Sequence, residues 1–516
     1  MEALRRHLGI RLRLSATAAV ALAGAALLGP WGCARLADRG PLVIAYDDVP
    51  LTLDPHLQNE SIVWNVLGNF YDALVVLTPE VRLEPGLAVA WEQKSPTLWR
   101  LTLREGVRFS NGDTLTAADV IASFDRARSH PRSGIRHHLV GVSAMRADGD
   151  LGLLVETRAP APDLLNRLAS LFVVPRRDAG AAEIARPVGT GPYRFVERAA
   201  DGSIRAEAWA SWRGVAEVRR VRMLFFQGAD EQAFSLLLNG SVDVMTSVGD
   251  DQLSRIEGQS GLRIVPQPRL AVQLLAVASQ AAQGTAGRAL ADPRVRRALL
   301  LALNRPAWVG RVFRGNATVA SQYVHPVVFG YDPSLQPAPY DPAAAKRLLA
   351  EAGFADGFEV TLGCAQGLQI AGEVRDDLAK VGVRVTLHEG AFGDVVRLAR
   401  TGEVPLFFYA WSCSTGDASD FLNSSAHSRD ERLGLGAENY SGFADRAVDA
   451  VLAQAEAEMT PARRLVLLQQ AQRQVLAALP VLPLTIRWAY VGVSDRVDIV
   501  TRHDQRLWIA ACRWRK

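Results

Sequence analysis

The chain has 516 residues, of which 49% are hydrophobic and 22% charged. This length and composition predict two or three globular domains and exclude a disordered or fibrous protein. The formal net charge is +4, and four arginines against one glutamate in the first thirteen residues account for +3 of it. The remainder is nearly neutral and lacks the basic stripe of a nucleic-acid-binding protein, so we expect no nucleic-acid partner.

Residues 1–32 have the pattern of a signal peptide. The basic start precedes an apolar run at 14–28, which has the length of a signal-peptide core and is short for a membrane span of about 20 residues. A single N-terminal membrane anchor is the alternative interpretation. We therefore expect an exported protein, located in the periplasm or at the cell surface.

Cys33 follows Gly32 directly after this core and is a candidate lipidation site. Lipoprotein signals usually place Leu three residues before such a cysteine, and this chain has Pro30 there. Attachment through a lipid on Cys33 and cleavage that releases a soluble protein both stay open.

Three further cysteines, Cys364, Cys413 and Cys512, could supply one disulfide in an oxidising compartment. Their spacing contains no CxxC pair and no Cys/His cluster. We therefore expect no metal site and no cofactor.

In the first third of the chain, apolar spacing predicts short strands and amphipathic helices. The expected strands are 41–46, 87–91 and 98–103, and the expected helices are 61–74 and 116–128. Thr116 and Asp119 have the spacing of a capping box at the start of the second helix. The Gly/Pro-rich stretch 186–195 fits no phosphate-binding fingerprint, so we interpret it as a structural turn.

The second half alternates helices and strands, which predicts an α/β sheet. The expected helices are 292–303, 342–349, 372–381, 444–457 and 461–478, and the expected strands are 358–362, 383–388, 405–411 and an extended segment at 480–493.

Four stretches of the chain stand in the order found in one known family. They are Trp99–Val120, with Asn111 in place of the usual Asp, Pro187–Tyr193, Asp292–Leu299 and Leu348–Phe354. With these stretches in register, nearly everything after residue 40 resembles the family 5 extracellular solute-binding proteins. That family includes the oligopeptide, dipeptide and nickel binders of bacterial importers.

The resemblance implies an α/β fold of the two-lobed, type II periplasmic-binding-protein kind with an extra inserted domain. Lobe I would combine 41–57, 186–268 and 487–516, the inserted domain would span 58–185, and lobe II would span 269–486. A solute would bind in the cleft and the lobes would close around it by hinge bending. The implied function is the substrate-binding component of an ABC importer, with membrane permease and ATPase subunits as partners, and we expect a monomer.

Two charged anchors of the family's peptide binders do not carry over. The peptide ammonium is held there by an Asp three residues after a Trp; the Trp is Trp411 here, and Ser414 stands at the anchor position. Asp417, three residues further on, is the alternative anchor. The Arg that holds the carboxylate in dipeptide binders corresponds to Leu368 and Gln369. These replacements disfavour an ordinary dipeptide and favour a modified peptide, an opine or a sugar conjugate.

Softer candidates for the cleft come from four other places. Trp411 and Trp488 could stack on a solute or pack in the core, and Arg487 could pair with an anionic group. The adjacent histidines His137 and His138 lack a third metal ligand, so a solvated loop is the favoured interpretation there. The candidates are Gln58, Asn59 and Glu60, His138 beside Arg136 and His137, Thr415 beside Ser414, and Arg487 with Trp488.

A hydrolase and a sensory receptor are the alternatives to a transport protein. Asp417 and Asp420 could form a paired-carboxylate site, but carboxylates near a turn more often cap a helix. The sequence has neither a GxSxG nor an HExxH motif. We therefore expect no enzyme, and binding without covalent chemistry.

Overall fold

The computed structural model describes residues 39–278, 283–366 and 368–515. The predicted signal peptide at 1–32 and Cys33 lie outside the described residues. Within the described part of the chain, no helix has the length and apolar character needed to cross a membrane.

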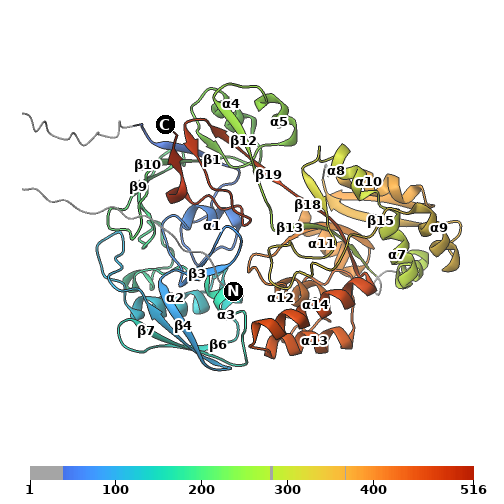
Figure 1. Cartoon of the computed structure of the whole chain (residues 1–516), viewed down its shortest axis with the longest axis horizontal. Coiled ribbons are helices and arrows are strands. Elements are labelled where there is room, and N and C mark those ends of the chain that lie inside the picture. The colour runs from blue at the N-terminus through green and yellow to red at the C-terminus, as the bar shows by residue number, and fades with distance from the viewer. Residues whose placement is uncertain (1–38, 279–282, 367, 516) are drawn as a thin grey trace, which may run out of the picture. The chain divides into compact units, whose positions relative to one another are not determined.

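The first large sheet has seven strands in the order β12-β19-β11-β1-β10-β9-β8. The central strand β1 pairs in parallel with β10 and β11, and its Leu42 and Ile44 are fully buried. Helices α4 (Glu231–Leu238) and α5 (Asp250–Ile256) lie beside β12 and β19 (Figure 1). The strands are β1 (Leu42–Tyr46), β8 (Tyr193–Arg198), β9 (Ile204–Ala208), β10 (Arg220–Phe225), β11 (Val244–Met245), β12 (Leu262–Gln267) and β19 (Ala489–Ser494).

A four-stranded antiparallel sheet, β4-β5-β7-β6, belongs to the chain between β1 and β8. Its buried side chains join those of the seven-stranded sheet in one continuous core. The elements are the strands β2 (Val75–Leu77), β3 (Leu83–Pro85), β4 (Ala88–Ser95), β5 (Leu98–Leu103), β6 (Val142–Ala147) and β7 (Gly152–Thr157), and the helices α1 (Ser61–Leu67), α2 (Ala117–Ser129) and α3 (Leu164–Leu168).

The capping box predicted at the start of α2 is present. The Asp119 carboxylate accepts hydrogen bonds from both the backbone N–H and the hydroxyl of Thr116, each at 2.9 Å. This satisfies a donor that the first turn of a helix otherwise leaves unpaired.

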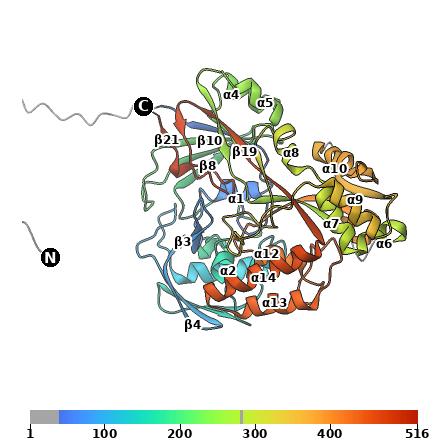
Figure 2. The same ribbon diagram turned by 45° about the vertical axis from the view of Figure 1, so that its right-hand side comes forward.

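The second large sheet has six strands in the order β14-β18-β13-β17-β15-β16. Two of the helices that cover it, α13 and α14, run side by side (Figure 2). The strands are β13 (Ala271–Val277), β14 (Ala317–Val319), β15 (Phe358–Ala365), β16 (Val383–Gly390), β17 (Leu406–Ser412) and β18 (Val481–Arg487). The helices are α6 (Gly284–Ala291), α7 (Pro293–Ala302), α8 (Arg305–Arg311), α9 (Pro342–Glu351), α10 (Gln369–Ala379), α11 (Phe392–Thr401), α12 (Ser419–Phe421), α13 (Arg446–Ala457) and α14 (Pro461–Ala478).

The extended segment predicted at 480–493 is two strands in two different sheets. β18 belongs to the six-stranded sheet and β19 to the seven-stranded sheet, with Trp488 between them. β12 and β13 are divided in the same way by residues 268–270. The apolar pattern of the sequence contains no break at Trp488. The two strands are assigned to different sheets by the strands that they pair with, and those strands lie far away in the sequence. The predicted domain boundaries stay a prediction.

The predicted helix at 61–74 ends early, since α1 stops at Leu67 and Gly68 follows as its C-cap. The chain then packs against the Gly/Pro-rich turn, where Gly191 donates a 2.9 Å hydrogen bond to the Phe70 oxygen. A Cβ atom on Gly189 would lie 2.1 Å from the same oxygen. This close backbone approach requires glycine, as expected for a structural turn.

The three cysteines within the described residues form no disulfide. Cys364, Cys413 and Cys512 are each fully buried as free thiols. They sit in three separate places: on β15, after β17 and near the C-terminus. The disulfide that the sequence allowed is therefore not formed by these three cysteines.

Candidate functional site

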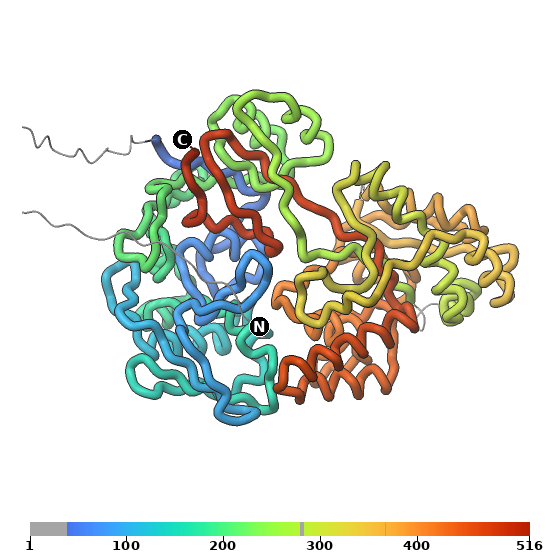
Figure 3. The backbone as a smooth tube through the Cα atoms, viewed as in Figure 1, coloured from blue at the N-terminus to red at the C-terminus, as the bar shows by residue number. Residues whose placement is uncertain are grey.

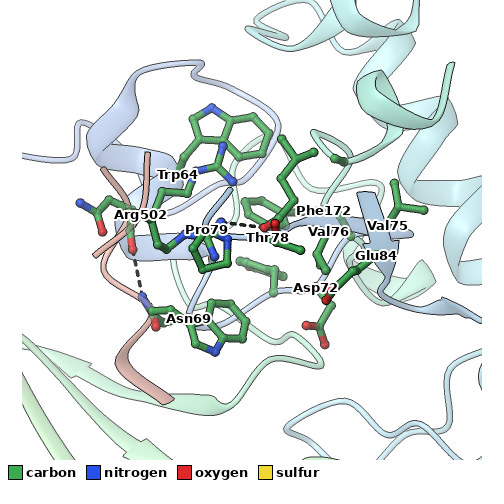
Figure 4. Close-up of a pocket in the computed structure, with 18 of the residues that line it drawn as sticks. Trp64, Asn69, Asp72, Val75, Val76, Thr78, Pro79, Glu84, Phe172 and Arg502 are labelled. Atoms are coloured by element: carbon green, nitrogen blue, oxygen red, sulfur yellow. Dashed lines mark hydrogen bonds between the residues drawn. The ribbon is translucent and has the colours of Figure 1, made fainter. Parts of the chain in front are cut away.

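A cavity of about 320 Å³ lies where segments from distant parts of the sequence meet. The C-terminal segment, red in Figure 3, lies against the early, blue part of the chain, and together they form most of the wall. Ser414 contributes to the lining from the loop after β17. Figure 4 labels ten of the other lining residues, namely Trp64, Asn69, Asp72, Val75, Val76, Thr78, Pro79, Glu84, Phe172 and Arg502. Arg213 and Arg506 also line the cavity.

Aromatic rings form one wall of the cavity. The rings of Trp64 and Phe172 have centroids 4.9 Å apart, and Tyr71 stacks on Phe172 at 6.1 Å. Trp64 comes from α1, whereas Phe172 follows α3. The wall offers a flat apolar surface to a solute.

Two asparagines join α1 to the C-terminal segment. The Asn65 side-chain oxygen accepts a 2.7 Å hydrogen bond from the Leu507 N–H, and the Asn69 oxygen accepts one from Ile509 at 2.9 Å. The Asn69 amide also donates to the Leu507 oxygen at 3.2 Å. Because Asn65 and Asn69 are four residues apart, both face the same segment, and they fix the cavity wall.

Four of the charged groups at the cavity are already paired with one another. Arg213 donates to both oxygens of Asp72, at 2.7 and 2.9 Å. Arg502 donates to both oxygens of Asp504, at 2.9 and 2.7 Å, and these bonds and the neighbouring arginines hold the pKa of Asp504 below its usual value against the effect of burial. By contrast, Glu84 is exposed, and its side chain makes no hydrogen bond or ion pair with any other residue in the described ranges.

The model of the bacterial extracellular solute-binding proteins, family 5 Middle, matches residues 82–432. The chain belongs to this family. It is a family of solute-binding proteins rather than enzymes, and its members are extracellular.

Curated relatives of the family resemble the chain over most of its length. A di/tripeptide-binding protein of Pseudomonas aeruginosa is 26% identical over 482 residues, covering 86% of this chain and 89% of the relative. The glutathione-binding protein of Escherichia coli is 26% identical over 462 residues, covering 86% and 88%.

Solved structures of similar fold agree with the family assignment. HbpA2 from Haemophilus parasuis has a TM-score of 0.81 at 24% identity, covering 92% of this chain and all of that chain. The ABC transporter-associated periplasmic binding protein DppA from Helicobacter pylori, in complex with a peptide, has a TM-score of 0.75 at 22% identity, covering 92% of this chain and 98% of that chain. The fold is the expected α/β, two-lobed type II fold.

The structure brings three sequence candidates to the cavity or next to it. Ser414 lines the cavity. Asn59 lies behind the aromatic wall, where its side-chain oxygen accepts hydrogen bonds from the indole N–H of Trp64 and from Nε2 of His138, both at 3.3 Å. Asn59 and His138 thus support the ring that a solute would meet.

His138 is not in a solvated loop, so that part of the sequence interpretation is wrong. It is 9% exposed within a short 3₁₀ helix. Burial, with the nearby positive charges of Arg167 and Arg506, lowers the pKa of His138 to about 3, so the ring is neutral at physiological pH. Of the other candidates nearby, the side-chain amide of Gln58 lies against the exposed carboxylate of Glu60 and donates to it in the orientation that turns the amide nitrogen toward the acid.

Asp417 is occupied by a buried ion pair. It is 4% exposed, and Arg464 donates to both of its oxygens, one bond measuring 3.0 Å. The carboxylate also accepts a 3.0 Å bond from the backbone N–H of Ser419. This arrangement supports a structural role for Asp417, as the sequence left open, while a role in solute binding stays a prediction.

Thr415 and Asp420 contact each other instead of the cavity. The Thr415 hydroxyl donates to the Asp420 carboxylate at 3.1 Å. Burial and the charges of Glu438 and Asp417 raise the pKa of Asp420 to about 7. Neither Asp417 nor Asp420 belongs to the cavity lining, so the hydrolase interpretation gains no support from the position of this pair.

The other candidates lie outside the cavity lining. Trp411 donates its indole N–H to Glu438 at 2.9 Å. Gln369 is exposed at the first turn of α10. Arg487 pairs with the Asp250 carboxylate at 2.7 Å, and Trp488 is 40% exposed between the two large sheets.

Reasoning from the sequence missed the aromatic wall and the C-terminal arginines. Trp64 lies within the predicted helix at 61–74 and showed no sign of a binding role, and no recognisable motif surrounds Arg506. The weak signal available was the pair Asn65 and Asn69, two amides four residues apart at the end of a short helix and just after it, whose side chains needed hydrogen-bond partners. In the described part of the chain, no group of three or more His, Cys, Asp or Glu side chains is placed to hold a metal.

Proposed function

We propose that this chain is the solute-capturing component of an ABC importer and that it binds a small peptide-like solute in the cavity beside Trp64. It would deliver the solute to permease and ATPase subunits in the membrane and carry out no chemistry itself. Relatives named for di/tripeptide and glutathione binding support this assignment, as does membership of a solute-binding family.

The charge pattern of the cavity is the observation that carries the proposal. Asp72 pairs with Arg213, and both oxygens of Asp504 accept hydrogen bonds from Arg502. Arg506 then has only a 3.8 Å contact with Asp504 and keeps its side-chain donors for a solute, while the side chain of Glu84 makes no ion pair with any described residue. Figure 4 shows Trp64, the neighbour of Arg506, and Glu84 on opposite sides of the cavity. A peptide carries a carboxylate and an ammonium group that match these two charges.

The size of the cavity also suits a short peptide. Its volume of about 320 Å³ lies near the lower end of the range for small-molecule sites, about 300–1,000 Å³. Ser414 carries no charge and cannot pair with the ammonium group of a peptide. Glu84 can take that role, and Arg506 can bind the carboxylate. This revises the expectation from sequence that disfavoured a zwitterionic solute.

Isothermal titration calorimetry with the purified mature protein tests the proposal. The panel contains dipeptides, tripeptides, glutathione, an opine and a sugar-conjugated peptide. We expect saturable, one-to-one binding of a di- or tripeptide or of glutathione, with no turnover detected by mass spectrometry. Binding restricted to the opine or the sugar conjugate would replace the peptide assignment, and turnover would contradict a pure binding role.

The mode of membrane attachment is a separate part of the proposal. Acylation of Cys33 would place the protein in the membrane fraction of the source cell, and Cys33→Ser would move it to the soluble fraction. Equal distribution of the wild type and the variant would contradict lipid attachment.

A further inference from the structure

Arg506 differs from Arg213 and Arg502 at the cavity because its side-chain donors have no hydrogen-bond acceptor among the described residues. Its guanidinium carbon lies 5.0 Å from the centre of the Trp64 ring, over the ring face. The side chain is 29% exposed and lines the cavity. A cation over an indole is held in orientation by the ring's electron density, while its edge stays free for hydrogen bonds.

The nearest acid does not neutralise this cation. Asp504 approaches Arg506 only to 3.8 Å, which is too long for a hydrogen bond. Both Asp504 oxygens already accept from Arg502. Two arginines therefore share one carboxylate, and Arg506 donates no side-chain hydrogen bond to any residue within 39–278, 283–366 and 368–515.

Burial of this guanidinium is costly, because none of its donors has a hydrogen-bond acceptor among the described residues. Loss of water and the positive charge of Arg502 lower the pKa of Arg506, while Asp504 opposes the shift. The side chain nevertheless keeps its charge, because an arginine in a protein stays protonated. Its five donors lie in one plane, which matches the two oxygens of a carboxylate.

We propose that Arg506 is the residue that selects the solute by binding a carboxylate group of the solute edge-on, while Trp64 holds the guanidinium plane from its face. The assignment rests on the proposed function in one respect, namely that this cavity is the solute site. The assignment does not depend on whether the rest of the solute is a peptide.

The test uses a probe pair that differs only in the carboxylate. Sodium phenylacetate and its neutral analogue phenylacetamide both offer a ring to the wall of Trp64 and Phe172. The melting temperature of the whole mature protein is measured with each compound at up to 50 mM and constant ionic strength. The variants are Arg506→Gln, Arg506→Lys and, as a control, Arg82→Gln, which removes the same charge from a side chain that is 76% exposed.

In the wild type and in R82Q, we expect a larger rise in melting temperature with phenylacetate than with phenylacetamide. R506Q should respond equally to both compounds, and R506K should keep a reduced preference because it retains the charge without the planar donors. Circular dichroism confirms that each variant is folded; if R506Q is not, R506K decides the outcome.

Equal responses of the wild type to the two compounds would overturn the proposal, as would an unchanged preference in R506Q or, where R506Q does not fold, in R506K. The proposed function fails separately. A preference for phenylacetate that depends on Arg506, in a protein that binds no peptide from the calorimetric panel, would keep Arg506 as the anchor and reject the peptide assignment.

Discussion

The side-chain amide of Asn166 donates a 2.7 Å hydrogen bond to the backbone oxygen of Thr415. Asn166 lies on α3, in the part of the chain that contains the four-stranded sheet, and Thr415 follows β17 of the six-stranded sheet. The bond therefore joins two parts of the fold next to Ser414, which lines the cavity.

Asn166→Ala should weaken solute binding without unfolding the protein. The net value of one such hydrogen bond is about 1 kcal/mol, which corresponds to a roughly fivefold loss of affinity. Calorimetry with the best ligand of the panel measures the effect. Asn111→Ala, in an exposed turn away from this contact, is the control. An unchanged dissociation constant in N166A would show that the contact does not contribute to the bound state.

The stability of the protein should fall as pH rises through the range from about 4 to 7. Burial and the charge of Asp163, together with other nearby acids, raise the pKa values of Asp420 and Glu456 to about 7, against about 4 in an unfolded chain. The folded state holds protons that the unfolded state has released, so the free energy of unfolding decreases with pH in that window. Urea denaturation at pH 5, 6, 7 and 8 measures this slope.

Two variants assign that slope to its residues. Glu456→Gln and Asp420→Asn should each flatten it, because each removes one titrating group. Asp125→Asn, whose side chain is 57% exposed, should leave it unchanged. Parallel curves for all four proteins would refute the assignment.

Asp417→Asn should destabilise the fold strongly. The variant removes the carboxylate that accepts two hydrogen bonds from Arg464, which is 3% exposed and then keeps only Glu456, at 3.8 Å, as an acidic neighbour. Breaking a buried pair on one side costs about 3–5 kcal/mol. Asp148→Asn is the matched control, since its pair with Arg100 is more than 40% exposed on both sides and is worth at most about 1 kcal/mol.

Urea unfolding and calorimetry together decide between the two roles of Asp417. A structural role predicts a lower midpoint of unfolding. Normal stability with complete loss of solute binding would instead make Asp417 the ammonium anchor.

Gly189→Ala should also be destabilising, because its Cβ atom would overlap the Phe70 oxygen at 2.1 Å. Neither backbone can move without breaking the contact that supports α1 and the cavity wall. Gly180→Ala is the control, since a Cβ atom there meets nothing within 4 Å. Thermal unfolding of both variants measures the difference, and equal melting temperatures would show that the turn can adapt.

The elements that depend on local chemistry could be predicted from the sequence. The helix expected at 461–478 is α14 residue for residue, with Pro461 at its first turn. The capping box of Thr116 and Asp119 also forms as predicted. In both cases the interacting residues lie within a few positions of one another, so the local sequence is enough to predict the structure.

The candidate site depends on contacts that the local pattern does not contain. Arg506 and Trp64 are 442 positions apart, and Asn65 meets Leu507 at the same separation. His138 looks polar and exposed in sequence, yet it is 9% exposed and its ring donates a hydrogen bond to Asn59, 79 positions earlier in the chain. The resemblance to the family pointed to Ser414 through its distance from Trp411, but no motif marks Arg506 or Glu84, and only the folded chain brings them to one cavity.

Within the described residues, the chain passes between the two large sheets at residues 268–270 and at Trp488. Two fixed points define a line, so a relative movement of the sheets reduces to rotation about that line and needs a single angle to describe it. Pro268 already restricts one φ to about −65° at the first point. Trp488 has no such restriction on its φ angle. The backbone angles of this residue would therefore limit the extent of the rotation.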